Sequence, residues 1–445
     1  MAITSATPVV APRFHAAVGT AAVVAPYRRC SYTESFARQG WRTVAVELDA
    51  RHRPPALGGA GTAGGYADAV EHRGTLRRTV KLLRGMGVTA VVAGSPAGCE
   101  LAERIAWQLG LPGADPLTSR LRYDRGAQAA ALTRAGIPAA RTIRTTSLAE
   151  ALAWAEACPL PRYTLAPAVV GTPVESLICA SPLQISAAWL SMKRAAARYS
   201  GDAHLVLAEE LSARRFVVNC VSRPGWGGRP DHVITDVWAE TRTSEGHPDR
   251  TDLLNRHELL SRGLSMYMLR VLDALGVVCG PVTARVAYDR GGGPLLVSAL
   301  AAPGMSLADE ALRRATGRDR ATDALDAWIP LPPKRLVPTP TGHQIVRVHL
   351  HPGSAGGIGP RLGNVLCQLP TVVAVGEHVP SHTTVVDGSP SGAEVVLSSA
   401  DPQAVEADYR VIRAFEGEGE GEGEGEGEGE GEGEGVGVGV GGRRR

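Results

Sequence analysis

The sequence predicts a mixed fold of the α/β and α+β classes, with an N-terminal α/β unit, a central antiparallel region and a C-terminal β-rich lobe. Three observations predict it. Short apolar runs alternate with amphipathic stretches between residues 21 and 109, which is typical of a parallel sheet. Two β-rich runs, 282–288 and 294–300, flank a glycine-rich turn and indicate a hairpin. Further strand-like runs between 344 and 397 precede a closing helix at 402–413.

The elements of the N-terminal unit alternate in type. Strands are expected at 21–25, 43–48 and 88–93, and helices at 32–40, 74–86 and 99–109. Glycines 59, 61 and 64 spell G-x-G-x-x-G, the pattern of a dinucleotide loop, but such a loop needs a strand directly before it and a helix directly after it. About ten residues, with two prolines among them, separate these glycines from the preceding strand. We therefore favour a surface loop.

The central region carries longer elements. Helices are expected at 126–135, 147–157 and 186–199, and strands at 205–211, 215–222 and 232–239. A helix at 259–275 stops at Gly276, since a glycine just beyond the last apolar residue ends many helices. The hairpin follows this helix. In the last section, strands are expected at 344–350, 371–375, 383–386 and 394–397.

Composition excludes several classes of protein. No apolar run approaches the ~18 residues that a membrane span needs. Aromatic residues make up only 4% of the chain, with no basic stripe interleaved by them, so nucleic acid is not an expected partner. The seven cysteines are scattered and form no C-x-x-C pair, which indicates free thiols in a reducing compartment. We expect a soluble, cytoplasmic protein without a membrane partner.

The net charge of +2 conceals an uneven distribution. From Glu416 the chain alternates Glu and Gly, and this tail holds ten Glu and three Arg. The rest of the chain therefore carries 44 basic and 35 acidic residues, a net charge of +9 that suits an anionic ligand. Only three of the basic residues are lysines (81, 193 and 334), although lysine is a usual phosphate contact.

The order of these elements resembles the ATP-grasp superfamily, in particular the bacterial ATP-dependent carboxylate–amine ligases that act on amino acids. Near the hairpin the matching phrases are LDALG at 272–276 and GP at 280–281 and 293–294. The run VVAGSPAGCELAERIAWQLGLP at 91–112 is similar to the pre-ATP-grasp domain, and QAVEADYRVIR at 403–413 is similar to the closing helix of the family. The resemblance implies a pre-ATP-grasp α/β domain at 1–115, an ATP-grasp region at 116–320, a C-terminal lobe at 321–415 and a disordered Glu-Gly tail at 416–445.

Ligases of this family use ATP to form an acyl phosphate that an amine then attacks, with lysines on the phosphates and Mg²⁺ held by carboxylates. This chain departs from the family pattern at the charged positions. Two phosphate-contacting lysines are replaced by Arg125 and Ala166, the glutamate that holds the ribose by Arg215, and the two metal-binding glutamates by Arg285 and Ser298. The resemblance therefore implies the fold more directly than the phosphoryl-transfer chemistry.

Five residues are candidates for cofactor binding by this resemblance: Arg125, Glu209, Leu211, Arg242 and Arg285. Glu209 stands where the family has the hinge residue beside adenine. No catalytic residue and no metal ligand is assigned. ATP is the candidate cofactor and Mg²⁺ is not expected, because its carboxylates are replaced. A small carboxylate is another candidate ligand, and a partner protein is a candidate partner.

Two functions stay open. The loss of five charged groups favours a non-catalytic ATP-grasp protein, acting as a partner subunit or ligand sensor, or a decaying copy. The alternative is an active ligase that forms an amide or peptide bond through an acyl phosphate, with relocated groups such as Arg125, Arg242 and either Asp236 or Asp289. Metal-dependent ATP turnover would separate the two.

Three histidines, at 343, 349 and 351, cluster near one expected strand. Residues two apart on a strand share a face, which would suit a metal ion. No cysteine or acidic residue joins them, so ordinary strand-end histidines are the favoured interpretation over a zinc site.

The Glu-Gly tail has no residues that could bury a core, so the sequence predicts that residues 416–445 contact no core. Deleting them should change the melting temperature by no more than about 1–2 °C, because a segment without packing adds little stability. Differential scanning calorimetry of the full and shortened chains tests this, and a large drop would show that the tail docks.

Overall fold

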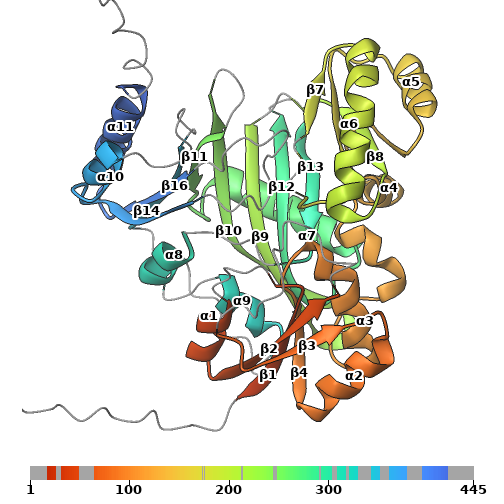
Figure 1. Cartoon of the computed structure of the whole chain (residues 1–445). Coiled ribbons are helices and arrows are strands. Elements are labelled where there is room, and N and C mark those ends of the chain that lie inside the picture. Colours follow the sequence, from red (N-terminus) through yellow and green to blue (C-terminus); the bar gives the residue numbers. More distant parts are fainter. Residues whose placement is uncertain are drawn as a thin grey trace, which may run out of the picture.

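The computed structural model describes residues 18–26, 32–49, 65–172, 174, 176–211, 214–243, 248–289, 292–302, 308–316, 320–328, 342–350, 360–377 and 393–418. The loop with the G-x-G-x-x-G pattern and the strand expected at 383–386 lie outside these residues. Figure 1 shows three sheets with helices on their faces. None of the helices in the described segments is long and apolar enough to cross a membrane.

The N-terminal unit is a parallel sheet, as the alternating pattern predicts. Its strands are β1 (Gly19–Val24), β2 (Trp41–Leu48), β3 (Asp68–His72) and β4 (Val88–Ala93), in the order β3-β2-β1-β4. Helices α1 (Tyr32–Arg38), α2 (Leu76–Gly85) and α3 (Cys99–Leu109) cover the sheet. Strand β3 was not among the expected strands, because its sequence, DAVEH, has a single buried apolar position, Val70.

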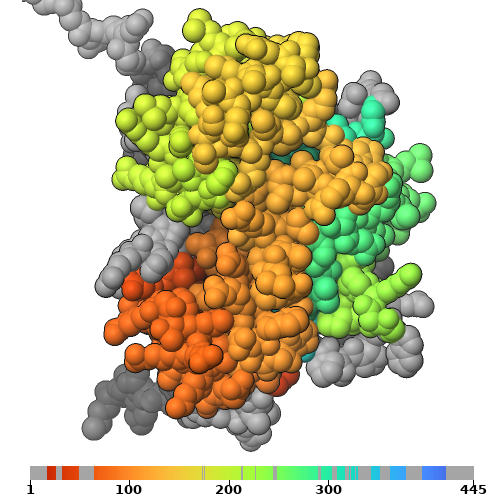
Figure 2. Space-filling view, turned by 90° about the vertical axis from the view of Figure 1, so that its right-hand side faces the viewer, coloured from red at the N-terminus to blue at the C-terminus, as the bar shows by residue number. Residues whose placement is uncertain are grey.

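A second, smaller sheet follows the short 3-10 helix η3 (Pro116–Arg122) and helix α4 (Arg125–Arg134). Its antiparallel strands are β5 (Thr142–Thr145), β6 (Tyr163–Pro167), β7 (Leu177–Cys179) and β8 (Leu205–Glu209), in the order β5-β8-β6-β7. Helices α5 (Leu148–Ala157) and α6 (Pro182–Ser200) pack on one face. Figure 2 shows this part, in yellow and yellow-green, as a lobe at the opposite end of the molecule from the N-terminal unit.

The third sheet is antiparallel throughout and has the strand order β13-β12-β9-β10-β11-β14-β16-β15. The bounds of its strands are β9 (Arg214–Pro224), β10 (Pro230–Arg242), β11 (Pro248–Leu253), β12 (Gly280–Asp289), β13 (Gly293–Leu300), β14 (Gln344–Leu350), β15 (Val372–Glu377) and β16 (Ala393–Ser399). The remaining helices are α7 (Leu259–Ala274), α8 (Ala308–Thr316), α9 (Arg320–Asp326), α10 (Pro360–Leu366) and α11 (Pro402–Glu418).

The strands of the C-terminal lobe continue the central sheet. Strand β11, which sequence reasoning did not find, pairs with β10 on one side and with β14 on the other. Its sequence, PDRTDL, is polar, so it lacks the apolar alternation by which strands are recognised. One sheet therefore connects the central region to the end of the chain.

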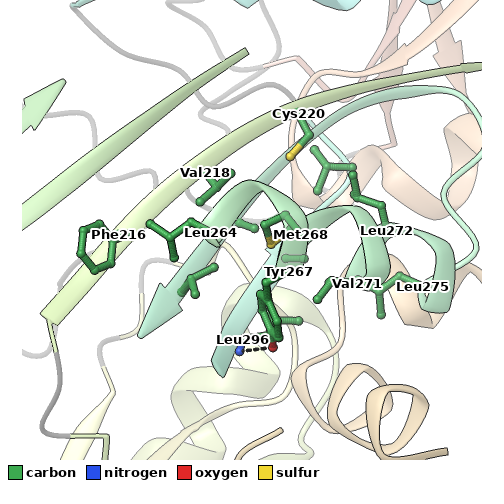
Figure 3. Packing of buried hydrophobic residues seen from close by; sticks show 14 of the residues in the cluster. Phe216, Val218, Cys220, Leu264, Tyr267, Met268, Val271, Leu272, Leu275 and Leu296 are labelled. Carbon is green, nitrogen blue, oxygen red and sulfur yellow. Dashed lines mark hydrogen bonds between the residues drawn. The ribbon is translucent and has the colours of Figure 1, made fainter. Parts of the chain in front are cut away.

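Helix α7 packs against one face of this sheet. Leu264, Met268 and Leu272 of the helix are fully buried against alternate residues of β9, among them Phe216 and Val218 (Figure 3). The helix ends where Gly276 adopts a left-handed φ of +63°, as the sequence predicts, because glycine takes that conformation without steric cost. With even-numbered β9 residues packed on α7, the odd-numbered ones face the opposite side of the sheet.

The last helix extends further than expected. Helix α11 runs to Glu418, and Arg413 pairs with Glu416 and with Asp249 of β11. The prediction that the tail makes no contact from Glu416 onward is therefore wrong for its first residue. Residues 419–445 lie outside the described part of the chain.

Arg122 joins the N-terminal unit to the central region. Its side chain is only 1% exposed and forms a bidentate pair with Glu103 of α3, with one Nη2–Oε2 distance of 2.7 Å. The same guanidinium donates to the carbonyl oxygens of Asp115 at 2.7 Å and of Leu275, at the end of α7, at 3.1 Å. One buried cation thus connects three segments.

Replacing Arg122 by Met should lower the free energy of unfolding by roughly 3–5 kcal/mol, since Glu103 and two carbonyl groups lose their donor in a buried site. The matched control is Arg120→Met, because Arg120 is exposed and such positions usually change stability by about 0.5 kcal/mol or less. Urea denaturation measures both. Equal stability of the two variants would contradict the role given to Arg122.

Candidate ligand-binding site

A cavity of about 350 Å³ lies between the small sheet and the large sheet. Strands β6, β7 and β8 contribute one wall, strands β9, β10, β12 and β13 contribute the other, and α4 closes the space between them. All five candidates from the sequence line this one cavity: Arg125, Glu209, Leu211, Arg242 and Arg285. The structure therefore brings together residues that are up to 160 positions apart in the chain.

Among the described residues of the small sheet that line the cavity, Glu209 at the end of β8 is charged and the others are uncharged. One face of this sheet packs its large apolar side chains, such as Leu165 and Leu207, against α5 and α6. The alternate residues Thr164, Ala166 and Val206 therefore point to the cavity. The family resemblance implies a lysine at the position of Ala166. At this position the wall therefore has no cation that could bind a phosphate group.

The wall from the large sheet is cationic. Arg215 of β9 lies opposite Glu240 of β10, and Arg285 of β12 lies opposite Val217 of β9 and Ser298 of β13. These residues belong to the face that α7 does not cover, because the alternate positions are buried against that helix. The positions that resemble the metal-binding pair of the family, Arg285 and Ser298, are direct neighbours across two strands and line the cavity.

Arg285 has no partner among the described residues. Its side chain donates no hydrogen bond and forms no ion pair with them. Burial lowers the pKa of Arg285, and the guanidinium groups of Arg242 and Arg347 add to that effect, while the Glu240 carboxylate opposes it. A guanidinium carries five N–H donors and no acceptor, so an unpaired, desolvated one is a strong attractor for an anion.

Glu240 is the site residue that sequence reasoning missed. Its side chain is 7% exposed, and its Oε1 accepts a hydrogen bond from Nε of Arg242 at 2.7 Å. Burial acts to raise the pKa of Glu240, but Arg285, Arg242 and Arg215 together lower it below its ordinary value. The strand expected at 232–239 ended three residues too early, since β10 runs to Arg242, and its alternation would have placed residue 240 on the same face as residue 242.

Arg125 begins α4 and is held in place by the backbone beside it. Its Nη1 donates to the carbonyl oxygens of Pro167 at 2.6 Å and of Val169 at 3.2 Å. Burial and the charge of Arg285 lower the pKa of Arg125 to about 10, against the opposing carboxylate of Asp124. The helix start is fixed because the Asp124 side chain accepts from the Ala127 N–H at 2.9 Å. Arg125 therefore presents its charge from a rigid position next to Arg285.

Glu209 and Leu211 stand at the end of β8. An Oε2 of Glu209 accepts from Nε of Arg141 at 2.6 Å, and the Glu209 N–H donates to the Arg141 carbonyl at 3.0 Å. Arg141 is 59% exposed, so this ion pair lies at the edge of the cavity and adds little to stability. The pair leaves the carboxylate of Glu209 partly neutralised.

Among the described residues that line the cavity, Glu209 is the only one with a carboxylate, and it is paired with Arg141. Within the described ranges, no group of three His, Cys, Asp or Glu side chains comes together that could hold a metal. Asp236 does not line the cavity; it accepts hydrogen bonds from Asn219 at 2.5 Å and Thr235 at 2.7 Å. The Asp289 side chain lies outside the described part. Asp236 is therefore unsuitable as the relocated metal ligand that sequence reasoning considered.

Only part of the histidine cluster lies within the described residues. Nε2 of His349 contacts Oγ1 of Thr251 at 3.1 Å, in the pairing of β14 with β11. His351 lies outside the described residues. The interpretation of these residues as ordinary strand-end histidines remains the favoured one.

Comparison with solved structures identifies the architecture. An L-amino acid ligase from Bacillus licheniformis superposes with a TM-score of 0.69 over 90% of this chain and 98% of that chain, at 13% identity. The fold is the ATP-grasp fold. N5-carboxyaminoimidazole synthase from Aspergillus clavatus, in complex with ADP and 5-aminoimidazole ribonucleotide, gives 0.66 over 90% and 99% at 11% identity. The biotin carboxylase domain of 2-oxoglutarate carboxylase from Hydrogenobacter thermophilus, in complex with MgADP, ADP and bicarbonate, gives 0.60 over 87% of both chains at 13% identity.

No protein-family model matches this sequence, and no curated protein matches it. The likeness is therefore one of ATP-grasp architecture, and the fold class that the sequence predicted is confirmed. Whether this ATP-grasp chain shares the chemistry of its structural neighbours depends on the residues of its own cavity.

Removing the counter-charge of the arginines should destabilise the protein. Glu240→Gln should lower the free energy of unfolding by roughly 3–5 kcal/mol, because it removes the buried carboxylate that pairs with Arg242 and faces Arg215 and Arg285. Added sulfate should restore part of the loss by binding the same cations. The control, Glu71→Gln, removes a carboxylate that is 42% exposed and paired with exposed Arg73, and should cost less than about 1 kcal/mol. Urea denaturation with and without sulfate tests this, and an unchanged Glu240→Gln would contradict it.

Proposed function

We propose that this chain is a non-catalytic ATP-grasp protein that binds a nucleotide without a metal ion, in a ligand-binding or partner-subunit role. The observation that supports the proposal is Arg285, an unpaired and partly buried guanidinium in the cavity, beside Ser298. Two of the structural neighbours were solved with ADP, which supports a nucleotide as the occupant of the equivalent space.

The electrostatics of the cavity disfavour Mg²⁺. At ~4 Å and an effective dielectric near 20, a guanidinium repels a divalent cation by several kcal/mol. Arg242 and Arg215 stand on the same wall and increase this repulsion, whereas Glu240 offsets about one charge. A polyphosphate has the opposite sign and gains from each of these groups. Arg285 is thus a fixed cation that supplies part of the positive charge a metal ion would bring to the phosphate groups.

Phosphoryl transfer needs more than binding. The transferred phosphoryl group is stabilised by cations that contact it from several sides. The wall from the small sheet has Ala166 and no charge at that position, and Arg125 is tied to two backbone carbonyls. The described lining can hold an anion on the side of the large sheet, but none of the described residues on the side of the small sheet presents a cation that would stabilise the transition state.

We expect ATP to bind at least as tightly in EDTA as with Mg²⁺, in a calorimetric titration of the whole chain. Arg285→Gln should weaken binding in EDTA about tenfold or more, since a charged hydrogen bond contributes ~1.5–3 kcal/mol. Arg214→Gln is the matched control: it removes a neighbouring charge that stacks on Phe216, with 5.5 Å from the guanidinium to the ring centre, away from the cavity. Arg214→Gln should bind ATP like the unaltered chain.

Phosphate release with a panel of amino acids should be absent. The double variant Arg285→Glu/Ser298→Glu should raise affinity for Mg²⁺, since it puts two carboxylates side by side across β12 and β13, yet Ala166 should still prevent turnover. Robust Mg²⁺-dependent phosphate release by the unaltered chain would overturn the proposal and favour an active ligase.

A further inference from the structure

Helix α2 presents a cationic face on the outside of the N-terminal unit. Its sequence, LRRTVKLLRG, contains four basic residues and no acidic one. These four, Arg77, Arg78, Lys81 and Arg84, are all exposed, and we call them the α2 face. The opposite side of the helix, with Leu83, is buried against the core of the unit. The charges of the α2 face are therefore held on a firmly packed helix.

The acidic residues around α2 are paired elsewhere. Arg77, Arg78 and Lys81 form no hydrogen bond or ion pair with any described residue. Strands β3 and β4 and helix α3 pack against α2. The four acidic residues of these elements each pair with an arginine outside α2: Asp68 with Arg42, Glu71 with Arg73, Glu100 with Arg104, and Glu103 with Arg122. The α2 face thus keeps its positive charge for a partner.

The composition of α2 favours an acidic peptide as that partner. A helix that lies on a membrane inserts a broad apolar face, but the apolar face of α2 is packed in the core, and Leu82 is the large apolar side chain that its outer side exposes. Proteins that bind single-stranded nucleic acid stack bases on aromatic side chains, and α2 has no aromatic residue. What remains is charge alone, on a convex surface.

The chain itself contains an acidic peptide of matching spacing. From Glu416 to Glu434, ten glutamates alternate with glycines. In an extended chain, residues two apart point to the same side and lie roughly 6.5–7 Å from each other. Arg77, Lys81 and Arg84 follow one another along the helix at roughly 6 and 4.5 Å, since each residue rises 1.5 Å. Successive glutamates can therefore meet successive cations.

Reach decides which α2 helix these glutamates contact. Helix α11 ends at Glu418, so the last glutamate, Glu434, can lie at most ~58 Å from it along a fully extended chain. Figure 1 shows α11 and α2 at opposite ends of the molecule. A folded chain of about 400 residues has a radius of gyration of roughly 21 Å, so the path over its surface between opposite ends is roughly 90 Å. The Glu-Gly segment is too short for that path and can only meet α2 of another copy.

We propose that the Glu-Gly segment of one copy of this chain binds the α2 face of a second copy. Exchange in both directions joins two copies by two equal contacts, as in a two-fold symmetric dimer. Each contact is weak, because exposed ion pairs contribute little individually. Once one contact has formed, the second is intramolecular and profits from a high effective concentration. The association does not involve the cavity, so it stands or falls independently of the proposed function.

Carbodiimide cross-linking tests the contact on the unaltered chain. The reagent condenses a carboxylate with a neighbouring lysine amine, with loss of water, and this chain has only three lysines: Lys81, Lys193 and Lys334. Peptide mass spectrometry at low salt should find the Glu-Gly segment joined to Lys81 at least about fivefold more often than to Lys193 of α6. About 0.5 M NaCl should remove most of this product, because the Debye length then falls to about 4 Å. Absence of the Lys81 product, or equal joining to Lys193, would overturn the proposal.

Mixing unlabelled and ¹⁵N-labelled chains before cross-linking shows which copy donates the glutamates. Products in which the Glu-Gly peptide and the Lys81 peptide carry different labels are expected, since the two peptides come from different copies. Products in which both peptides always carry the same label would show a contact within one chain and would overturn the proposed exchange.

A double variant assigns the contact to the α2 face. Arg77→Gln/Arg78→Gln keeps Lys81 as the reporter and should lower the Lys81 product about fivefold, as expected for the loss of two exposed ion pairs. The matched control, Arg194→Gln/Arg198→Gln, removes two exposed arginines beside Lys193 on α6 and should leave the Lys81 product unchanged. An equal loss in both variants would overturn the assignment.

Vesicles provide the competing occupant. Vesicles with phosphatidylserine should not compete with the Lys81 product at about 0.1 M salt. Vesicles that suppress this product and bind the unaltered chain, but not Arg77→Gln/Arg78→Gln, would overturn the proposal in favour of a membrane as the partner of the α2 face. Circular dichroism of each variant confirms that the folded chain is being compared.

Discussion

Several guanidinium groups, opposed by the buried carboxylates of Glu240 and Glu210, set the charge of the cavity. Glu240 offsets part of the charge of Arg215, Arg242 and Arg285, and Glu210 lies 3.6 Å from Arg215. Such an arrangement is costly for the free protein, because each uncompensated buried charge loses hydration that its neighbours do not restore. An anionic ligand removes that cost on binding, and a metal cation increases it.

The two walls of the cavity differ because the two faces of each sheet carry different side chains. On the large sheet, α7 covers one face with aliphatic side chains, and the alternate residues of β9, β10 and β12 are left to face the cavity. On the small sheet, α5 and α6 take the large apolar residues of one face, and the described residues of the sheet that line the cavity are uncharged apart from Glu209. An arginine-rich wall opposite a largely uncharged wall suits a ligand that is anionic along one edge and flat or apolar along the other.

The comparison with ATP-grasp enzymes shows that one fold is kept at low sequence identity. An architecture that aligns over 90% of this chain with an L-amino acid ligase is retained at 13% identity, because element order and core packing tolerate wide change in sequence. The charged side chains of the cavity are not constrained by that packing. Arg285 and Ser298, where the family resemblance implies carboxylates, pair across the hairpin of β12 and β13, and Arg285 gives this hairpin a positive charge at the cavity.

The sequence by itself determined the types and order of most elements, because the periodicity of apolar residues and the glycine that ends α7 are local signals. It also identified five residues that share the cavity, since matching frame phrases imply a shared arrangement. Only the tertiary structure decided that polar β11 joins β10 to β14, that Glu240 compensates the arginines, and that Asp236 is bound by Asn219 and Thr235. Each of these depends on which strand pairs with which and on how deeply a charge is buried. Contacts between residues distant in the chain set both properties, and no short stretch of sequence records them.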